Sequence, residues 1–308
     1  MPLLTPQSRG VFTIAVTPFL PGGAIDFDSL DRVTDFYAEK GASGLTILGM
    51  MGEAPKLTQE ESRAVAARVI ARAGDLPVVV GVSAPGLAAI RELSAAVMDM
   101  GAAGVMIAPP SSLRTDAQIL GYFQQAAAAA GAGVPVVLQD FPLATGVQID
   151  AGLLLRIFAE VPQIMMLKHE DWPGLAKITA LRRAEAAGAR RVPILCGNAG
   201  VFLPEEMARG ADGAMTGFAY PEMLAQVVDL VTAGDMDRAQ DIFDAYLPLV
   251  RYEQQPGLGL AVRKHVLARR GAIAHADQRA PGAALPPEAV AEVERLIERQ
   301  ERRLQELN

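Results

Sequence analysis

Hydrophobic residues along the chain form short continuous runs, separated by longer stretches in which they recur at the spacing of a helix face. The runs are rich in β-branched residues and apolar at consecutive positions, as is typical of parallel strands covered on both faces. Eight such strands are predicted, at residues 11–16, 45–48, 78–82, 105–108, 136–139, 164–168, 194–196 and 214–216. Helices are expected between them, for example at residues 29–40, 59–73, 88–100 and 116–130.

The residue types at the expected helix starts agree with these ranges. Thr58 and Glu61 have the spacing of a capping box, in which two side chains satisfy the free N–H groups of a helix start. Asp28 and Asp116 are candidate N-caps of two other helices, because a short carboxylate can accept a hydrogen bond from the first turn.

One helix-to-strand junction occurs three times, as Gly-Ala-x-Gly in KGASGLTIL from Lys40, MGAAGVMIA from Met100 and RGADGAMTG from Arg209. The first glycine suits a left-handed residue that ends a helix, and the second permits a tight entry into a strand. Eight strand–helix units with short loops favour a (β/α)8 TIM barrel over an open doubly wound sheet, because the first strand is followed by TPFLPGGAID and not by G-x-G-x-x-G.

Additional C-terminal helices are expected beyond the eighth strand, at residues 223–231, 236–247, 258–269 and 287–307. We therefore divide the chain into a (β/α)8 barrel at 8–220 and a C-terminal helical extension at 221–308 that packs on it. The last helix has an apolar stripe, which we expect to pack on its own barrel in preference to a partner. Its members are Val290, Val293, Ile297, Leu304 and Leu307.

Composition narrows the classes of partner. Half of the 308 residues are apolar, and the net charge of −7 has no basic block to offset it, which argues against nucleic acid and anionic membranes. A small molecule is the expected partner. The N-terminus has no signal-peptide pattern and no apolar stretch could span a bilayer, so we expect a cytoplasmic protein. The lone Cys196 fits a reducing compartment, and we interpret it as a buried apolar residue.

The chemistry of a barrel lies at the C-terminal ends of its strands, and there one lysine stands out. Lys168 follows the apolar run Ile-Met-Met-Leu, whereas the other four lysines fall on helices or in a loop. A lysine in apolar surroundings loses its charge more readily than its reference pKa of about 10.4 suggests, and the neutral amine can attack a ketone without a cofactor. The alternative is a salt bridge from Lys168 to Glu170 or Glu53.

A series of motifs at these strand ends resembles the dihydrodipicolinate synthase and N-acetylneuraminate lyase family, in order and over nearly all of residues 8–300. It comprises AVTPF with Thr17, GMMGE at 49–53, APP at 108–110, QDFPLATG at 139–146, LKHED at 167–171 and GNAG at 197–200. The resemblance implies a (β/α)8 class I aldolase or dehydratase, a homo-oligomer such as a tetramer or dimer. It also implies that Lys168 forms a Schiff base with pyruvate or another 2-keto acid.

Several positions depart from the family pattern. Met50 and Met51 stand where two hydroxyl residues usually hold the keto acid's carboxylate, although the N–H groups of Met51 and Gly52 could still bind it. Gln139 aligns with the tyrosine that relays protons, and Ser111 lies near the position of the second tyrosine of that relay. Ala144 replaces the arginine that grips the aldehyde substrate in dihydrodipicolinate synthase, which argues against that activity.

Glu170 is the nearest candidate for the missing proton relay. Side chains alternate along a strand, so Glu170 is expected on the face of Lys168, and His169 on the opposite face. The Lys-x-Glu sequence with QDFP resembles the 2-keto-3-deoxy sugar acid dehydratases of the family. The alternative is that Glu170 is only an ion-pair partner of Lys168 or Lys56.

The remaining polar residues have less specific interpretations. Asn198 either binds substrate hydroxyls or stabilises a tight turn. Asp140 is expected to orient a neighbour or to cap a loop, and His169 to be packed. The three histidines have no close-spaced acidic partners, so no metal site is predicted.

Two classes of function therefore remain. The first is a cofactor-independent lyase, which dehydrates or cleaves a 2-keto-3-deoxy sugar acid, or alternatively is a pyruvate-dependent aldolase of the dihydrodipicolinate synthase type. The second is a keto-acid-binding barrel without catalysis. We favour the enzyme, because an isolated lysine kept in apolar surroundings without a use is destabilising.

Overall fold

The computed structural model of the chain describes residues 2–172 and 174–307, and its strands form one closed barrel. Every strand pairs in parallel with its neighbours, and β8 closes the ring on β1. The strands are β1 Gly10–Ile14, β2 Gly44–Ile47, β3 Val78–Gly81, β4 Gly104–Ile107, β5 Val136–Asp140, β6 Ile164–His169, β7 Ile194–Cys196 and β8 Gly213–Ala214. The predicted TIM barrel is confirmed.

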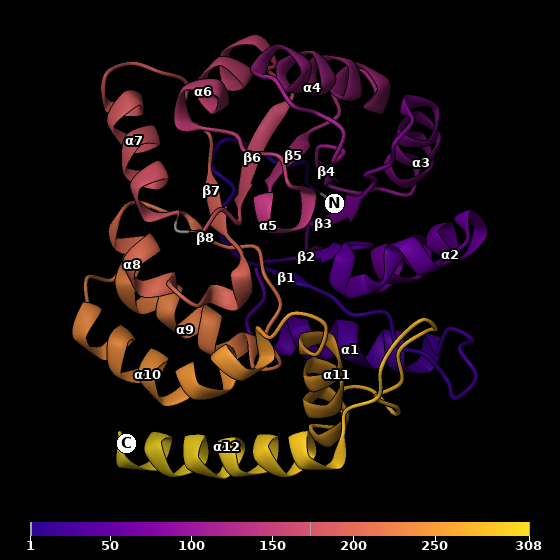
Figure 1. Cartoon of the computed structure of the whole chain (residues 1–308), viewed down its shortest axis with the longest axis vertical. Coiled ribbons are helices and arrows are strands. Elements are labelled where there is room, and N and C mark those ends of the chain that lie inside the picture. The colour runs from indigo at the N-terminus through magenta and orange to yellow at the C-terminus, as the bar shows by residue number, and fades with distance from the viewer. Residues whose placement is uncertain (1, 173, 308) are drawn as a thin grey trace.

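Helices surround the strands, and α10, α11 and α12 gather at one end of the molecule (Figure 1). The helices are α1 Phe27–Glu39, α2 Gln59–Arg72, α3 Leu87–Asp99, α4 Asp116–Ala130, α5 Pro142–Thr145, α6 Ala151–Glu160, α7 Leu175–Ala186, α8 Leu203–Ala208, α9 Pro221–Thr232, α10 Met236–Glu253, α11 Gly259–Arg269 and α12 Pro287–Glu306. Short 3-10 turns lie at Met50–Gly52, Ala54–Lys56 and Asn198–Gly200. The four inter-strand helices named from the sequence are confirmed to within two residues.

The helix caps agree with the sequence in one case and differ in two. The capping box is present, since Thr58 Oγ1 accepts from Glu61 N at 3.1 Å while Thr58 N donates to Glu61 Oε2 at 2.9 Å. Asp28 and Asp116 are not N-caps, because each already lies inside the first helical turn, where its own backbone is helical. Asp26 and Thr115 hold those positions instead.

The repeated glycines have the conformations that the sequence predicts. Gly41, Gly101 and Gly210 end helices at φ values of +88°, +98° and +95°, which a side chain would strain. The second glycines allow close approach of strands. A Cβ on Gly213 would lie 2.0 Å from Gly10 O of the paired strand β1, so only glycine fits there.

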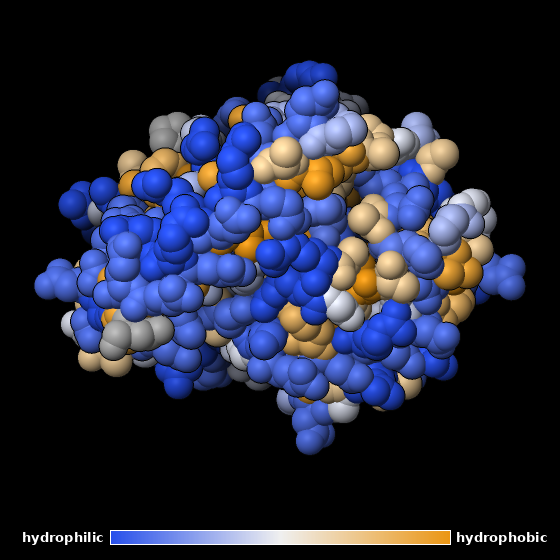
Figure 2. Space-filling model, turned by 90° about the horizontal axis from the view of Figure 1, so that it is seen from below, coloured by the Kyte–Doolittle hydropathy of each residue, from blue (hydrophilic) through white to orange (hydrophobic). Residues whose placement is uncertain are grey.

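The C-terminal helices divide into two groups by what they contact. Helix α9 packs on β1 and β8 and completes the ring of helices around the barrel, whereas α12 packs on α10. Val293 and Ile297 of the apolar stripe are buried, so the stripe packs on its own chain. Seen from below the view of Figure 1, the surface is mostly hydrophilic with small separate hydrophobic patches (Figure 2). The division at residue 220 stays a prediction.

Two apolar cores follow from the alternation of side chains along the strands. One lies between the strands and the helices. The other fills the inside of the barrel, with Phe12, Val79, Val137, Met166 and Leu195 among its members. Residues two positions further along the same strands therefore also face inward, at the mouth. In the described part of the chain, no helix has both the length and the apolar character needed to cross a membrane.

Candidate active site

Lys168 lies at the C-terminal end of β6, directly above the inward-facing Met166. Its partner in the barrel sheet is Gln139 of β5, so the two side chains enter the mouth next to each other. Only 5% of Lys168 is exposed, which makes its charge costly unless a partner balances it. The lysine therefore needs an anion within hydrogen-bonding distance.

Glu170 is that anion. Its Oε2 lies 3.1 Å from Lys168 Nζ and accepts a hydrogen bond from Gln139 Nε2 at 2.6 Å. Glu170 is 6% exposed, so the contact is shielded from solvent. The expectation that Glu170 shares the face of Lys168 is confirmed, and of the two alternative salt-bridge partners Glu170 is the one present. A carboxylate at this distance can take a proton from the ammonium and leave a neutral amine.

Gly197, directly after β7, makes the position of Glu170 possible. A Cβ on this residue would lie 2.1 Å from Glu170 Cγ, so any side chain would displace the carboxylate. The sequence contained the GNAG motif, but it gave no sign that its glycine makes room for an acid on the neighbouring strand. The next residue, Asn198, donates from Nδ2 to Glu170 O at 3.2 Å. Its buried Oδ1 has no partner among the described residues.

At the ends of β5 and β6, the side chains that point away from the barrel mouth make structural contacts. His169 Nε2 lies 3.1 Å from Gly174 O, in agreement with the expected packed position. Asp140 is fully buried and its Oδ2 lies 2.7 Å from Lys177 Nζ of α7. This pair fixes the end of β5 to a helix outside the barrel, so Asp140 and His169 support the site from behind.

The loop after β2 forms another wall of the mouth. Gly52 N donates to Gly49 O at 3.1 Å, so this amide is already committed, and of the two predicted carboxylate donors Met51 N remains. Thr17 Oγ1 donates to Gly52 O at 2.6 Å and supports the loop from beneath. Thr17 therefore positions the loop, and it is not among the residues that line the two cavities described below.

Glu53, at the end of this loop, is anchored to the C-terminal extension. Its carboxylate lies 2.6 Å from Lys264 Nζ and 2.8 Å from Lys56 Nζ, and it accepts from Arg279 N at 3.1 Å. Lys264 also lies over the Phe19 ring, and burial lowers the pKa of this lysine. Glu53 is thus not the partner of Lys168, and Lys56 is not the partner of Glu170.

Arg263 enters the mouth from α11 and was not predicted. Its Nε donates to Glu253 Oε1 at 2.6 Å, and its Nη2 donates to Gly217 O at 2.5 Å. Burial raises the pKa of Glu253, and the neighbouring guanidinium opposes that rise. The sequence places residue 263 on an extra helix, and nothing in that pattern indicates that the side chain reaches the barrel.

These side chains enclose a small cavity of about 70 Å³, which we call the chamber. It is lined by Ile14, Met50, Met51, Gln139, Phe141, Lys168, Glu170, Asn198, Ala199, Thr216, Gly217, Gln254 and Arg263. Most of the predicted site residues thus come together. Ser111 does not: it is exposed, its carbonyl accepts from Arg114, and it does not line the chamber.

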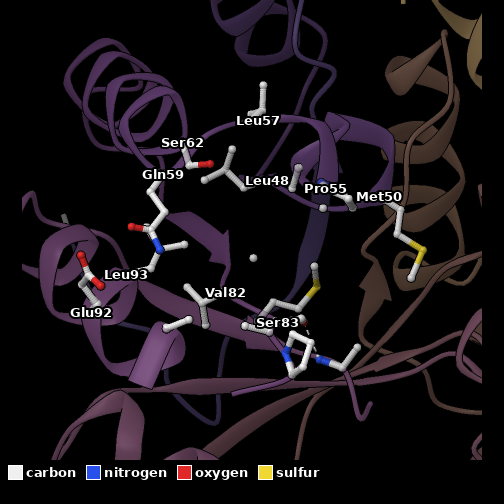
Figure 3. A pocket seen from close by; sticks show the side chains of 18 of the residues that line it. Leu48, Met50, Pro55, Leu57, Gln59, Ser62, Val82, Ser83, Glu92 and Leu93 are labelled. Atoms are coloured by element: carbon white, nitrogen blue, oxygen red, sulfur yellow. Dashed lines mark hydrogen bonds between the residues drawn. The ribbon is translucent and has the colours of Figure 1, made fainter. Parts of the chain in front are cut away.

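A larger cavity of about 470 Å³ adjoins the chamber, and Met50 and Gln139 line both. Figure 3 shows Met50 on one side of this cavity and Glu92 with Leu93 on the other, with Leu48 and Val82 between them. Ligand pockets typically measure about 300–1,000 Å³, so the chamber alone holds only a reacting end and the adjoining cavity has room for the rest of a substrate.

Comparisons with known proteins agree with the geometry. Residues 7–300 match the model of the dihydrodipicolinate synthetase family. L-2-keto-3-deoxyarabonate dehydratase of Azospirillum brasilense is 32% identical over 298 residues, which cover 94% of this chain and 93% of the relative. 4-Hydroxy-tetrahydrodipicolinate synthase of Sorangium cellulosum is 34% identical over 244 residues, which cover 78% of this chain and 79% of the relative.

A solved structure has the same fold throughout. The crystal structure of dihydrodipicolinate synthase from Rhodopseudomonas palustris superposes with a TM-score of 0.96 at 55% sequence identity, over 97% of this chain and all of the other. The match covers the barrel and the C-terminal helices alike. Together with the family match, this shows that the chain belongs to the dihydrodipicolinate synthetase family, whose members are lyases that act as aldolases or dehydratases.

Proposed function

We propose that this lyase forms a Schiff base between Lys168 and a 2-keto acid, and that it dehydrates a 2-keto-3-deoxy sugar acid. The observation that carries the proposal is the contact of 3.1 Å between Lys168 Nζ and Glu170 Oε2 inside the chamber. It pairs a nucleophilic amine with a carboxylate that can accept and return protons. The 32% identity with the dehydratase of Azospirillum brasilense over 94% of the chain supports this reaction.

The proposed chemistry assigns each proton to a named group. The neutral amine of Lys168 attacks C2 of the keto acid, and one amine proton moves to the C2 oxygen. A second proton, from solvent water, lets that oxygen leave as water and gives a protonated imine. Glu170 then removes a proton from C3, which gives an enamine. The enamine electrons expel the C4 hydroxyl, and the protonated Glu170 returns its proton so that this group leaves as water. A second water hydrolyses the imine and releases the dehydrated keto acid.

The other chamber residues have supporting roles in this proposal. Gln139 holds Glu170 through the 2.6 Å hydrogen bond and so fixes the carboxylate next to the amine. Asn198 offers its unpaired Oδ1 to a substrate hydroxyl, and Met50 and Met51 cover the reacting carbons. The sugar chain beyond C4 extends into the adjoining cavity, where Gln59 and Ser83 provide polar contacts.

A second candidate is a pyruvate-dependent aldolase of the dihydrodipicolinate synthase type. The 55% identity with the Rhodopseudomonas palustris structure of that name favours it. Gln139 and Ala144 argue against it, because neither side chain can act as a phenol relay or bind a carboxylate by charge. A keto-acid-binding barrel without turnover is the third possibility, and the experiments must distinguish it from the two enzymes.

Borohydride trapping tests the covalent step. The protein is incubated with pyruvate and with 2-keto-3-deoxypentonates and hexonates, reduced with borohydride, digested and analysed by mass spectrometry. We expect a secondary amine on Lys168 with at least one keto acid, its loss in Lys168→Ala, and its retention in Lys40→Ala, a matched change at a helix end. No adduct, or an adduct on another lysine, would refute the Schiff base.

Turnover of Glu170→Gln tests the proton work. We expect Glu170→Gln to keep the trapped adduct while turnover falls by roughly 10²–10⁴-fold, the usual contribution of a general acid or base. Intact turnover, or loss of trapping, would leave Glu170 as an ion-pair partner only. Trapping in wild-type protein without turnover of any keto acid would identify a binding barrel.

Assembly and location complete the proposal. Family members act on small keto acids and commonly form homo-oligomers, and we extend this to a dimer or tetramer of the present chain. Analytical ultracentrifugation would find a single 32.5 kDa species if this is wrong. We assign the protein to the cytoplasm, since its one cysteine, Cys196, is buried and free.

A further inference from the structure

Arg263 lines the chamber and has an unused hydrogen-bond donor. The side chain is 3% exposed, and two of its three nitrogens are bound, Nε to Glu253 and Nη2 to Gly217 O. The third, Nη1, is buried and has no hydrogen-bond partner among the described residues. Arg263 also lines the chamber together with Lys168. The arginine is therefore fixed in place with one nitrogen left over.

The surrounding backbone is shaped to keep Nη1 where it is. A Cβ on Gly217 would lie 2.1 Å from Nη1, so only glycine after β8 leaves room for the guanidinium. Leaving a buried donor unpaired is costly, and more so when it is charged. A ligand oxygen that accepts from Nη1 would offset that cost.

Several other donors at the mouth are committed or are consumed by the reaction, and those that remain, such as Met51 N and the Thr216 hydroxyl, carry no charge. Gln139 Nε2 donates to Glu170, and Gly52 N donates to Gly49 O. Met50 and Met51 offer no side-chain donor. Lys168 is the reacting amine. Arg263 is the other cation that lines the chamber.

We propose that Arg263 Nη1 binds the C1 carboxylate of the 2-keto acid and is the residue that selects a keto acid over a neutral ketone. This rests on the proposed Schiff-base function. A carboxylate is costly to bury without a donor, and a hydrogen bond from a guanidinium is among the strongest that a protein offers it.

The position of Arg263 agrees with this role. The Cβ site of Gly217 lies 3.1 Å from Ile14 O, and that of Gly52 lies 3.4 Å from Ala15 O. The guanidinium and the turn that contains Met51 N thus both lie near the end of β1. Glu253 holds the guanidinium plane through Nε and acts as a positioning residue.

Pyruvate and pyruvamide form a pair of probes that share the ketone and differ in the charge at C1. Borohydride trapping on Lys168 is measured as a function of concentration for each probe, and the ratio of the half-saturating concentrations gives the preference for the acid. The main variant is the double change Arg263→Met with Glu253→Gln, which removes both buried charges together. Glu253→Gln alone is the matched control, because it retains the arginine and an oxygen that can accept from Nε.

We expect wild-type protein and Glu253→Gln to prefer pyruvate. The double variant is expected to lose roughly 10–100-fold of that preference, as is typical when a hydrogen bond to a charged group is lost. Its thermal unfolding reports whether the fold survives. If the double variant does not fold, Arg263→Lys is measured in its place. Lysine keeps the positive charge but lacks the planar guanidinium, so the preference for pyruvate should still fall.

The failure of this inference and that of the proposed function give different results. If the folded double variant, or Arg263→Lys in its place, keeps the full preference for pyruvate, Arg263 does not bind the carboxylate, while the Schiff base stands. If wild-type protein forms no adduct with either probe or with any longer keto acid, the proposed function fails and this inference fails with it.

Discussion

Glu206 of α8 provides a quantitative test of the structure that does not depend on the substrate. Burial raises the pKa of this carboxyl from 4.5 to about 7, and the nearby His169 and the Cys196 thiol only partly oppose that rise. The folded protein therefore keeps a proton on Glu206 over a range of pH in which the unfolded chain has lost it. Glu206→Gln replaces the carboxyl with a side chain that stays neutral at every pH.

The sign and size of the effect follow from proton linkage. Below pH 4.5 both states bind the proton, so Glu206 costs nothing there. Between pH 4.5 and 7 the unfolded chain ionises first, and the free energy of unfolding falls by about 1.36 kcal/mol per pH unit. Above pH 7 both states are ionised and the loss is constant. Relative to Glu206→Gln, the wild-type protein should lose about 3 kcal/mol of stability between pH 4 and pH 8.

Urea unfolding of both proteins at several pH values measures this difference. Every other titrating group is common to the two proteins, so the difference between their unfolding free energies isolates residue 206. Glu205→Gln, a change at the exposed neighbouring position, removes a charge that helps to raise the pKa of Glu206, so it should give a much smaller pH-dependent difference than Glu206→Gln. A constant difference for Glu206→Gln, or one in which wild-type protein gains stability as pH rises, would show that Glu206 is not buried as described.

Three further changes test other parts of the structure. Gly197→Ala places a methyl group 2.1 Å from Glu170 Cγ, so turnover of the best substrate should fall by roughly 10²–10⁴-fold while borohydride trapping persists; unchanged turnover would contradict the geometry. Lys264→Met removes a buried partner of Glu53 and should lower the free energy of urea unfolding by about 3–5 kcal/mol, and a loss below 1 kcal/mol would show the pair to be dispensable. Thr58→Ala removes a helix cap and should cost about 0.5–2 kcal/mol in the same assay, whereas no loss would argue against the capping box.

The barrel could be predicted from the sequence because its signals are local. Continuous apolar runs report strands that are buried on both faces, and the alternation of side chains along a strand predicts that Lys168 and Glu170 share one face. The Gly-Ala-x-Gly junctions report backbone conformations that only glycine adopts readily, as at Gly41. A local signal gives the wrong residue where two nearby positions fit it equally well. Asp28 is such a case, because it lies two residues after the actual cap.

The rest of the site depends on contacts between residues far apart in the chain. Lys264 contacts Glu53 across 211 positions, and Arg263 contacts Gly217 across 46. A helical pattern shows which residues share a face, but not that a charged residue on an additional helix reaches the mouth of a barrel. The effect of Gly197 on Glu170 is equally invisible, since it is the absence of a side chain on a neighbouring strand that matters.

Helix α11 contributes to the candidate site, because two of its consecutive residues contact two walls of the barrel mouth. Lys264 binds Glu53, which ends the loop after β2, while Arg263 reaches the chamber beside β8. Buried ion pairs add little to stability in themselves, but losing one partner leaves a charge without compensation. The pairs at Glu53 and Glu253 therefore fix the position of α11 relative to the barrel more than they strengthen the fold. A helix held in this way can present a charged donor to a substrate without a flexible loop, which lowers the entropy cost of binding it.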